Sequence, residues 1–392
     1  MEKIGVLRGP CLNPFEGQYF EKLPKFGFQP VGIATFDISF DRSEIGFPVR
    51  YGHTFKTVTR GKFNFFLNIL TITKFDFRAY NFYLWDFKKL TSDLPLLHSN
   101  DISYAFSYQA VKTKIPTIIT EWENIPFNYE TQPYSKIKSY CRTHAQHFVA
   151  ITQKAKEALL MEGVNDERIS VIPAGIDCER FKPSQKDPTL LKQKGIPPNS
   201  FNVLFVGRLV PEKGIFSLLE AFSNLQNKFS NIQLLIVGSG SPEIKAQINK
   251  FVIDKRIGKN VKFLGAIRYR DMPKIHNIAD VFCLPSIPVR TWAEQFGFSL
   301  VEAMACGKPV VSTFSGSIPE VVRDRQTGYL VEPNNARSIE VALESLIVDE
   351  KTRTDLGKNG RQWVLQQFEA NVVAKQLADI YKRQLGNMGT EN

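Results

Sequence analysis

The second half of the chain alternates short apolar runs with amphipathic segments, and this alternation restricts the fold more than any other feature. Residues 202–207 predict a buried strand, and apolar residues at three- and four-residue spacing in 215–229 predict one face of a helix. Strands that alternate with helices in this way predict βαβ units around a parallel sheet. Further strands are expected at 233–237, 261–264, 280–284, 309–312 and 329–331.

The first half of the chain repeats this alternation less regularly. Its strands are expected at 3–7, 31–35, 95–98, 117–120 and 147–150, and a loop at 9–17 follows the first of them. A chain of 392 residues is long enough for two domains. The polar, proline-containing run 182–188 is the expected linker. We therefore predict an α/β protein with two parallel sheets in two domains, residues 1–182 and 183–369.

The composition excludes several classes of protein. Hydrophobic residues make up 43% and charged residues 23% of the chain, as is typical of a soluble globular protein. No apolar stretch reaches the ~20 residues that a membrane-spanning helix needs. The run Met1–Leu7 predicts a strand rather than a signal peptide. Five scattered cysteines, with no pair at metal-ligand spacing, predict free thiols in a reducing cytoplasm.

The formal charge of +11 raises the question of an anionic partner. Its positive residues are dispersed, and no run resembles a zinc finger or another nucleic-acid motif, so nucleic acid is not an expected partner. Attraction to an anionic membrane face and simple solubility both remain as explanations. The aromatic-rich run 63–85, with basic residues within and beside it, fits a helical core segment or an interfacial patch that docks on a membrane.

A pair of glutamates gives the most specific functional signal. Glu294 and Glu302 follow an apolar, strand-like run at 281–285, and Glu302 begins a helix-like run at 302–306. This order places two carboxylates at the carboxyl edge of a parallel sheet, where open α/β sheets bind ligands. Carboxylates suit the hydroxyls of a sugar or ribose, and backbone N–H groups at a helix start suit a phosphate. The combination indicates a nucleotide sugar.

Two plainer interpretations compete with this one. Ser299 and Glu302 have the spacing of a capping box, in which the glutamate only satisfies a backbone donor of its helix. Glu294 also fits an ordinary solvated loop residue. Glu302 can cap its helix and bind a ribose at the same time, so the first alternative does not exclude the site.

Five runs, taken together and in order, resemble the retaining family 4 glycosyltransferases of the GT-B fold. The likeness is strong over about residues 165–370 and weak in the first domain. The runs are Val-Ile-Pro-Ala-Gly-Ile-Asp at 171–177 with Phe181 and Pro183, Val-Gly-Arg-Leu-Val-Pro-Glu-Lys-Gly at 206–214, Glu-Gln-Phe-Gly followed by Glu-Ala-Met-Ala within 294–305, Gly-Ser-Ile-Pro-Glu-Val at 316–321 and Thr-Gly-Tyr-Leu-Val at 327–331.

The resemblance implies two Rossmann-like domains that face each other across a cleft. Residues 183–369 are then expected to bind a nucleoside-diphosphate sugar and residues 1–182 the acceptor, with a final helix at about 370–386 that packs back on the first domain. The donor is a co-substrate, and no cofactor or metal is expected, because cationic side chains and a helix amino terminus replace the metal in this fold.

The resemblance also assigns catalytic roles. Arg208 and Lys213 match the family's diphosphate-binding pair, and fixed cations there stabilise the negative charge that the leaving diphosphate gains in the transition state. A solvated pair of loop cations is the plainer alternative. Glu294 is expected to hold hydroxyls of the transferred sugar.

The remaining donor contacts follow from the same motifs. Backbone N–H groups of Phe296 and Gly297 are expected to approach the sugar and phosphate, and Glu302 is expected to bind the ribose hydroxyls. Gly17, in the loop after the first strand, is expected to face the diphosphate. Base recognition is expected near Gly265, mainly through the backbone.

The chain departs from the family in the first domain. Many members carry a histidine that contacts the donor sugar just after the strand at 117–120, and this chain has none there. Trp122 falls at or near that place, and Glu121 or Glu123 is a candidate for a polar contact. Asp101 and His98 are candidates from the neighbouring strand end, although His98 fits a structural strand-end histidine better.

These observations predict a retaining glycosyltransferase that transfers a hexose-type sugar from a UDP- or GDP-sugar to a glycan, lipid or small-molecule acceptor. The expected setting is cell-envelope polysaccharide biosynthesis, in the cytoplasm or at the inner face of the membrane. Two alternatives stay open. One is a GT-B sugar-nucleotide epimerase, and the other is a non-catalytic scaffold or sensor that binds a nucleotide sugar, which the missing histidine favours.

Overall fold

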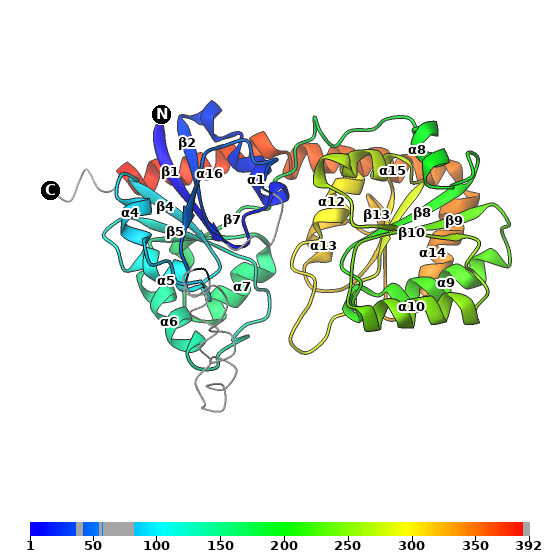
Figure 1. Cartoon of the computed structure of the whole chain (residues 1–392), viewed down its shortest axis with the longest axis horizontal. Helices are drawn as coiled ribbons and strands as arrows, with labels where there is room; N and C mark the ends of the chain where they lie inside the picture. The colour runs from blue at the N-terminus through cyan, green and yellow to red at the C-terminus, as the bar shows by residue number, and fades with distance from the viewer. Residues whose placement is uncertain (37–41, 55–56, 58–81, 387–392) are drawn as a thin grey trace. The chain divides into compact units, whose positions relative to one another are not determined.

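The computed structural model describes residues 1–36, 42–54, 57 and 82–386 (Figure 1). Its internal contacts divide the chain into two compact units. Unit 1 contains residues 1–175 and the chain from Ala370 onward, and unit 2 contains Ile176–Glu369. The first crossing between the units therefore lies before the linker expected at 182–188.

Unit 1 contains a seven-stranded parallel sheet with the strand order β3-β2-β1-β4-β5-β6-β7 in the described residues. All five strands predicted in this half are present, and β3 and β7 are additional. The strands are β1 (Glu2–Gly9), β2 (Phe28–Thr35), β3 (Val49–Gly52), β4 (Leu96–Asn100), β5 (Thr117–Glu121), β6 (His147–Ala150) and β7 (Ile169–Val171).

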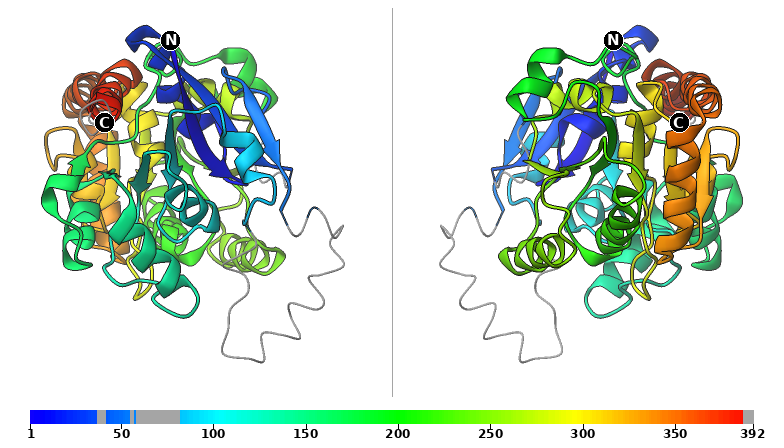
Figure 2. Two further views of the ribbon diagram at one scale, coloured as in Figure 1. Left: turned by 90° about the vertical axis from the view of Figure 1, so that its left-hand side faces the viewer. Right: turned by 90° about the vertical axis from the view of Figure 1, so that its right-hand side faces the viewer.

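Helices cover both faces of this sheet (Figures 1 and 2). On one face α1 packs against α16, and on the other α5 packs against α6. The helices are α1 (Pro14–Phe20), α4 (Phe87–Thr91), α5 (Ala105–Val111), α6 (Tyr134–His144), α7 (Gln153–Met161) and α16 (Ala370–Gly386), with short 3-10 turns at Leu23–Phe26 and Asp166–Arg168. The last helix of the chain thus belongs to the core of unit 1.

His98 shows how α16 is anchored. The histidine is fully buried in β4, its Nδ1 lies 2.6 Å from the hydroxyl of Tyr381 on α16, and its Nε2 lies 2.7 Å from the hydroxyl of Thr120 on β5. Both ring nitrogens therefore have partners inside unit 1. His98 is a structural histidine, and its candidacy as a sugar contact is wrong.

Unit 2 contains a six-stranded parallel sheet in the order β10-β9-β8-β11-β12-β13 in the described part of the chain. Each of these strands was predicted from a short, mainly apolar run. The central strands β8 and β11 are buried along most of their length, whereas β10, at the edge of the sheet, has exposed residues at Phe263 and Gly265. The strands are β8 (Phe201–Val206), β9 (Ile232–Val237), β10 (Val261–Gly265), β11 (Val281–Leu284), β12 (Val310–Thr313) and β13 (Gly328–Val331).

The helices of unit 2 bury the apolar faces that the sequence indicates. In α9, Ile215, Leu218, Leu219 and Phe222 are fully buried. The helices are α8 (Pro188–Gln193), α9 (Ile215–Gln226), α10 (Pro242–Asp254), α11 (Met272–Asn277), α12 (Phe298–Ala305), α13 (Ile318–Val321), α14 (Ala336–Val348) and α15 (Glu350–Gln367), with 3-10 turns η4 (Pro211–Lys213) and η5 (Tyr269–Asp271). No helix in the described residues is long and apolar enough to cross a membrane.

Each sheet reverses its strand order once. The chain moves outward from β1 through β2 to β3 and then returns to β4, and in unit 2 it moves from β8 through β9 to β10 and returns to β11. Loops after the two central strands leave in opposite directions at such a point, and ligands of open α/β sheets bind in the crevice that results. The two places to look for a site are therefore the carboxyl ends of β1 and β4 and those of β8 and β11.

Candidate functional site

The loop after β8 packs tightly against the loop after β11. Gly214 ends this loop with φ +72°, and a Cβ there would lie 1.9 Å from the carbonyl oxygen of Pro285. The backbone N–H of Ile287 donates to the carbonyl oxygen of Glu212 over 2.8 Å. Only glycine permits the approach at Gly214. The two loops at the switch point of unit 2 are thus fixed to each other.

This contact brings two predicted site residues together. Lys213 Nζ, from η4, lies 2.6 Å from Glu294 Oε2, from the loop after β11. The hydroxyl of Ser286 donates to the same oxygen over 2.8 Å. Glu294 is only 6% exposed, so the interpretation of a solvated loop residue is wrong. An ammonium, a carboxylate and a hydroxyl therefore share one partly buried position.

A third loop fixes the backbone of Glu294. Gly316, after β12, has φ +55°, and a Cβ there would lie 2.1 Å from the Glu294 carbonyl oxygen. The N–H of Ser317 donates to that same oxygen over 2.8 Å. The Gly-Ser pair of the fourth sequence run therefore holds the main chain of the acidic residue.

Arg208 lies in the loop after β8, and its side chain is exposed. The structure gives it no polar partner among the described residues, whereas Lys213 is paired with Glu294. The two cations of the predicted diphosphate pair are therefore on the same loop, but only Lys213 forms an ion pair among the described residues. The guanidinium of Arg208 is exposed, whereas the ammonium of Lys213 is paired with a carboxylate.

The start of α12 carries the next predicted contacts. Phe296 is 2% exposed, and its ring meets Phe298 at a centroid distance of 5.2 Å, so its side chain belongs to the core. Gly297 has φ +85° and is the N-cap of α12, with no side-chain cap. At these two positions only the backbone N–H groups are left for binding, and the sequence predicted a role for those groups.

Glu302 lies in the second turn of α12 and is 4% exposed. Its Oε2 lies 3.1 Å from Nε2 of the fully buried His276 on α11. Ser299 is inside the helix and donates to the carbonyl oxygen of Val206, so no capping box forms and that interpretation is wrong. Glu302 is turned toward a neighbouring helix instead.

Gly265 ends β10 on the same sheet edge. Its carbonyl oxygen accepts from the N–H of Gly238, and a Cβ at Gly238 would lie 1.8 Å from the carbonyl oxygen of Gly207. The ends of β8, β9 and β10 are therefore tied together. Gly265 is two strands away from the switch point, and an added Cβ there would meet no atom within 4 Å.

The corresponding edge of unit 1 differs from the prediction at Gly17. The glycine lies inside α1 and not in the loop, its N–H bonds to the carbonyl oxygen of Asn13, and it is buried. A Cβ there would meet no atom closer than 3.8 Å, so no close approach demands a glycine. Residues 14–20 become helical because Asn13 caps Glu16 and Pro14 occupies the first turn.

Trp122 and Glu121 follow directly from β5. The indole Nε1 of Trp122 donates to Asn100 Oδ1 over 2.7 Å. The Glu121 carboxylate, 2% exposed, accepts from the N–H groups of Ile102, Trp122 and Glu123. Burial raises the pKa of this carboxyl well above its usual range. Glu121 therefore joins the loops after β4 and β5 and is not open to a sugar.

Asp101 and Glu123 also have local partners. Asp101 has φ +61° and accepts from the N–H and the hydroxyl of Ser103. Glu123 accepts from the N–H of Ile125 and from the Asn128 side chain, both over 3.0 Å, and burial raises the pKa of its carboxyl. The structure thus places Asp101, Trp122 and Glu123 after adjacent strands, each engaged in holding a loop.

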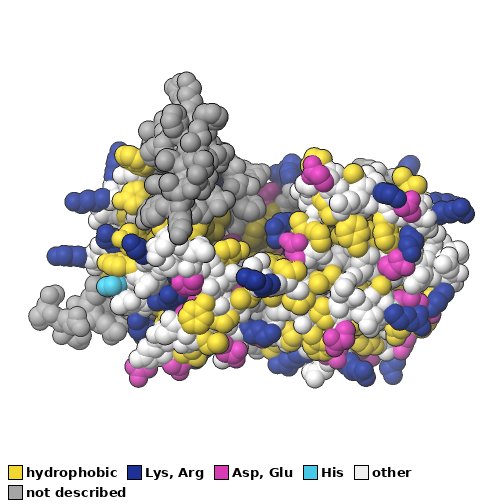
Figure 3. All heavy atoms as spheres, turned by 90° about the horizontal axis from the view of Figure 1, so that it is seen from below, with side chains coloured by type: hydrophobic (Ala, Val, Ile, Leu, Met, Phe, Trp, Pro, Cys, Tyr) yellow, Lys and Arg dark blue, Asp and Glu magenta, His cyan; other side chains and the backbone are white. Residues whose placement is uncertain are grey.

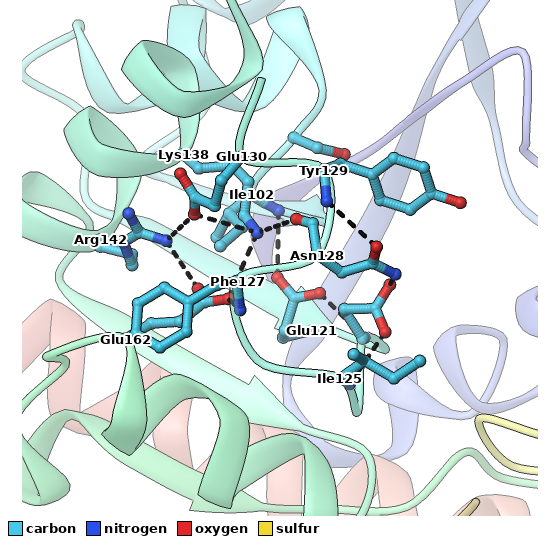
Figure 4. A network of polar contacts seen from close by, with 12 residues as sticks. Ile102, Glu121, Ile125, Phe127, Asn128, Tyr129, Glu130, Lys138, Arg142 and Glu162 are labelled. Atoms are coloured by element: carbon cyan, nitrogen blue, oxygen red, sulfur yellow. Dashed lines mark hydrogen bonds and ion pairs between the residues drawn. The ribbon is translucent and has the colours of Figure 1, made fainter. Parts of the chain in front are cut away.

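Figure 4 shows what fixes the loop at 122–133. Lys138, 3% exposed on α6, donates to the carbonyl oxygen of Asn128 over 2.7 Å and lies 3.3 Å from Glu162 and 3.4 Å from Glu130. Arg142 lies 2.7 Å from each of the same two carboxylates. This partly buried cluster of two cations and two anions ties the loop to α6 and α7.

The aromatic run at 63–85 lies largely outside the described residues. Of its last members, Tyr83 is 40% and Trp85 62% exposed. Lys88 and Lys89, on α4, are exposed as well. On the face shown in Figure 3, basic and acidic side chains lie interspersed.

The five cysteines are unpaired, and Cys11 is the one that is not fully buried. Burial raises the pKa of Cys178 and of Cys306 to about 12, so both are thiols at neutral pH. Within the described ranges, no group of three or more His, Cys, Asp or Glu residues is placed to hold a metal ion.

Two doubly wound parallel sheets, one with a cation and carboxylate pair at its switch point, define the GT-B class of fold. Comparison with family models agrees with this class. Residues 27–180 match the model described as Glycosyltransferase Family 4, and residues 186–363 match the model described as Glycosyl transferases group 1. The chain belongs to this family of glycosyltransferases.

Curated relatives match about half of the chain. A GDP-mannose-dependent alpha-(1-6)-phosphatidylinositol monomannoside mannosyltransferase of Mycobacterium tuberculosis is 30% identical over 55% of this chain and 56% of its own length. A lipopolysaccharide 1,2-N-acetylglucosaminetransferase of Salmonella typhimurium is 31% identical over 60% of this chain and 61% of its own length. The chain thus spans less than two thirds of the length of these relatives.

Solved structures match over nearly the whole chain. HepE from Anabaena, in complex with UDP and glucose, has a TM-score of 0.78 at 20% identity and covers 98% of this chain and 100% of its own. A glycosyltransferase from Rickettsia africae has a TM-score of 0.75 at 21% identity and covers 98% of this chain and 99% of its own. At these identities the likeness shows the fold.

Three residues of the site were not predicted. Ser286 and Trp292 contact the predicted pair Lys213 and Glu294, and His276 contacts Glu302. Ser286 and Trp292 lie within eight residues before Glu294, so the spacing to the motif was a usable signal. His276 lies on another helix, and no local pattern relates it to Glu302.

Proposed function

We propose that this protein transfers a hexose-type sugar, with retention, from a nucleoside-diphosphate sugar to a glycan, lipid or small-molecule acceptor. The observation that carries the proposal is the meeting of Lys213 and Glu294 at the switch point of unit 2, 2.6 Å apart. A diphosphate needs a fixed cation, and a sugar needs a fixed hydrogen-bond acceptor for its hydroxyls. Family membership and the glycosyltransferases among the relatives support the same conclusion.

In this proposal, Arg208 and Lys213 bind the donor diphosphate and stabilise it as the leaving group. Charge grows on the diphosphate as the glycosidic bond breaks, and cations already in place need no reorganisation at that moment. Lys213 Nζ gives up its contact with Glu294 Oε2 when the diphosphate arrives. The released carboxylate, still held by Ser286 and through its backbone by Ser317, then accepts from sugar hydroxyls.

Glu302 is proposed to bind the ribose. Oε2 of Glu302 is in contact with His276 Nε2, and Oε1 has no side-chain partner in the described part of the chain.

The other donor contacts are proposed as follows. Backbone N–H groups at Phe296 and Gly297 approach the sugar and phosphate, and the main chain near Gly265 recognises the base. In unit 1, Trp122, Glu123 and Asp101 are proposed as sugar contacts through surfaces that their loop bonds leave open. Gly17, in α1, is proposed to face the donor diphosphate.

A donor and acceptor screen tests the proposed activity. Purified protein is incubated with UDP-, GDP- and ADP-sugars and with lipid and polysaccharide extracts as acceptors, and release of nucleoside diphosphate is measured. We expect release with one donor that depends on an acceptor, and NMR of the product is expected to show the same anomeric configuration as in the donor. Absence of release with every combination would contradict the proposal, and inversion would contradict the retaining mechanism.

We also propose that the protein works in the cytoplasm, at the inner face of the membrane. The exposed Trp85 beside Lys88 and Lys89 has the composition of an interfacial contact, and the formal charge of +11 favours an anionic surface. Flotation with vesicles that contain anionic lipid tests this. Wild-type protein is expected to float and the variant Trp85→Ala with Lys88→Glu to float less, whereas equal flotation would contradict it.

A non-catalytic sensor of nucleotide sugars is the second candidate. Trp122 in place of the family's histidine, and the ion pair that occupies Lys213, are the observations that favour it. A sensor would bind one nucleotide sugar tightly and release no nucleoside diphosphate with any acceptor. The screen above therefore separates the two candidates.

A further inference from the structure

The chain between β11 and Glu294 folds into a small hairpin. The N–H of Val289 donates to the carbonyl oxygen of Trp292 over 2.8 Å, and the N–H of Trp292 donates back to the carbonyl oxygen of Val289 over 3.2 Å. Arg290 and Thr291 form the exposed turn between them. Reciprocal bonds of this kind fix the direction in which Trp292 leaves the backbone.

The base of the hairpin is attached to the segment that carries Lys213. The N–H of Ile287 donates to the carbonyl oxygen of Glu212, and Pro285 packs against Gly214 at a distance that leaves no room for a Cβ. Lys213 lies between these two anchored positions. These backbone contacts therefore fix the position of the hairpin relative to the segment that carries Lys213.

Within this frame, Lys213 has two different partners. Its Nζ lies 2.6 Å from Glu294 Oε2 and 4.8 Å from the ring centroid of Trp292, which is half-buried. An ammonium within about 6 Å of an indole face is attracted by the negative potential of the ring. One partner is an anion, and the other is a neutral aromatic ring.

The two partners respond differently to a donor diphosphate. The diphosphate competes with Glu294 for the ammonium, because both are anions. The indole carries no charge, so its attraction for the ammonium persists when a phosphate replaces the carboxylate. A lysine has four rotatable side-chain bonds and loses freedom when it binds, and a ring that already holds it in place reduces that loss.

We propose that Trp292 is a positioning residue that holds the Lys213 ammonium in place for the diphosphate of the donor. The inference rests on the proposed function, because its ligand is the donor of that reaction. Trp292 acts through Lys213 and not by contact with the diphosphate. Its effect on binding must therefore disappear when the lysine is removed.

A double-mutant cycle on nucleotide affinity tests this. The dissociation constants of UDP, GDP and ADP are measured by calorimetry for the full chain as wild type, Trp292→Leu, Lys213→Ala and the double variant. Leucine keeps apolar bulk on the hairpin but has no aromatic ring. We expect Trp292→Leu to weaken binding by about three- to thirtyfold and to cause no further loss in the Lys213→Ala protein.

Two further variants separate positioning from folding. Trp292→Phe keeps an aromatic face and is expected to lose about threefold or less. Val289→Ala lies at the paired position of the same hairpin, on an exposed side chain, and is expected to bind as wild type does. Circular dichroism and the melting temperature of every variant show that its fold is retained.

Three results would overturn the inference. Wild-type affinity in Trp292→Leu would show that the ring does not matter, and an equal loss with and without Lys213 would show that it does not act through the lysine. In both cases wild type still binds a nucleotide and the proposed function stands. Failure of wild type to bind any of the three nucleotides would overturn the proposed function together with the inference.

Discussion

The switch points of the two sheets use their polar residues differently. In unit 2, Lys213 and Glu294 come from separate loops and form an ion pair, with 2.6 Å between Lys213 Nζ and Glu294 Oε2. In unit 1, the side chain of Glu121 accepts hydrogen bonds from three backbone N–H groups, and both ring nitrogens of His98 have hydrogen-bond partners inside the core. The charged pair of unit 2 joins two side chains, whereas the polar groups of unit 1 fix the backbone and the core of their own unit.

Glycines permit close contacts at both switch points, and in unit 1 a Cβ added at Gly9, at the end of β1, would lie 2.7 Å from the ring of Phe106. In unit 2, Gly214 and Gly316 allow backbone contacts that any Cβ would prevent, and both contacts position loops at the switch point. In unit 1, Gly17 lies in a helix with room around it. The close contacts of unit 2 therefore fix the loops that carry Lys213 and Glu294, whereas the position of Gly17 does not require a glycine.

The largest effect is expected from removal of the lysine. Lys213→Ala should lower turnover by about 10²–10³-fold, because a fixed cation no longer stabilises the leaving diphosphate. Lys213→Arg should retain part of the activity. Release of nucleoside diphosphate at saturating acceptor measures both. A wild-type rate in Lys213→Ala would contradict the proposal that this lysine stabilises the leaving diphosphate.

Glu294→Gln should separate sugar binding from nucleotide binding. Turnover is expected to fall by about 10- to 100-fold, since a charged hydrogen-bond acceptor for the sugar is lost. Affinity for the nucleoside diphosphate without sugar should stay equal or rise, because the anion that competes for Lys213 is gone. Calorimetry measures the affinity, and Glu123→Gln in unit 1 is the matched control that should leave it unchanged. A loss of nucleotide affinity in Glu294→Gln would contradict the exchange of partners.

A smaller effect is expected at the proposed ribose contact. Glu302→Ala should weaken nucleotide binding about tenfold with little effect on the rate at saturating donor. His276→Gln, which removes the partner of Glu302, should cause a smaller loss of the same kind. Steady-state kinetics give both quantities. A fall in the rate at saturation with unchanged binding would move Glu302 out of the donor site.

The loop contact at Gly316 should appear in stability. Gly316→Ala places a Cβ 2.1 Å from the Glu294 carbonyl oxygen and is expected to cost roughly 1–3 kcal/mol for overpacking, plus roughly 1–2 kcal/mol for the positive φ. Gly195 has φ +61° and no atom within 4 Å of an added Cβ, so Gly195→Ala should show only the second cost. Melting temperatures measure the difference. Equal shifts for the two variants would contradict the close contact.

The smallest effect concerns the histidines of unit 1. Burial holds the pKa of His98 well below its usual value of 6.5 and lowers the pKa of His147 to about 4. Both groups bind protons more weakly in the folded state, so their neutral forms contribute stability that is present above pH 6.5 and is lost as the pH falls toward 4. The melting temperature should therefore decrease over this range, and less steeply in His98→Gln. An identical slope in both proteins would show that His98 does not titrate with folding.

The sequence predicted the sheet of unit 2 almost completely, and the reason is local. Each of its strands is a short, mainly apolar run between helical patterns, and the central strands β8 and β11 have this composition because they are buried on both faces. The pairing of Lys213 with Glu294 was also within reach, since each residue belongs to a motif that follows a central strand. Proximity of the two motifs follows from the strand order.

Other features have no local signal. His276 reaches Glu302 from a different helix, and the contact depends on how α11 and α12 pack. Gly17 was placed in a loop because the glycine-containing run follows a strand, whereas the Asn13 cap makes it helical. Trp292 was missed because its role depends on a hairpin whose turn has none of the usual glycine or asparagine residues.

The central claim is that unit 2 binds the donor nucleotide at the ends of β8 and β11. Its most direct test is a thermal-shift titration of wild type and Lys213→Ala with UDP, GDP, ADP and their sugars. A ligand at about 100 times its dissociation constant adds ~2.7 kcal/mol of apparent stability. We expect such a shift for wild type with one nucleotide, larger for one of its sugars, and a much smaller shift for Lys213→Ala. Equal shifts in the two proteins, or none in wild type, would contradict it.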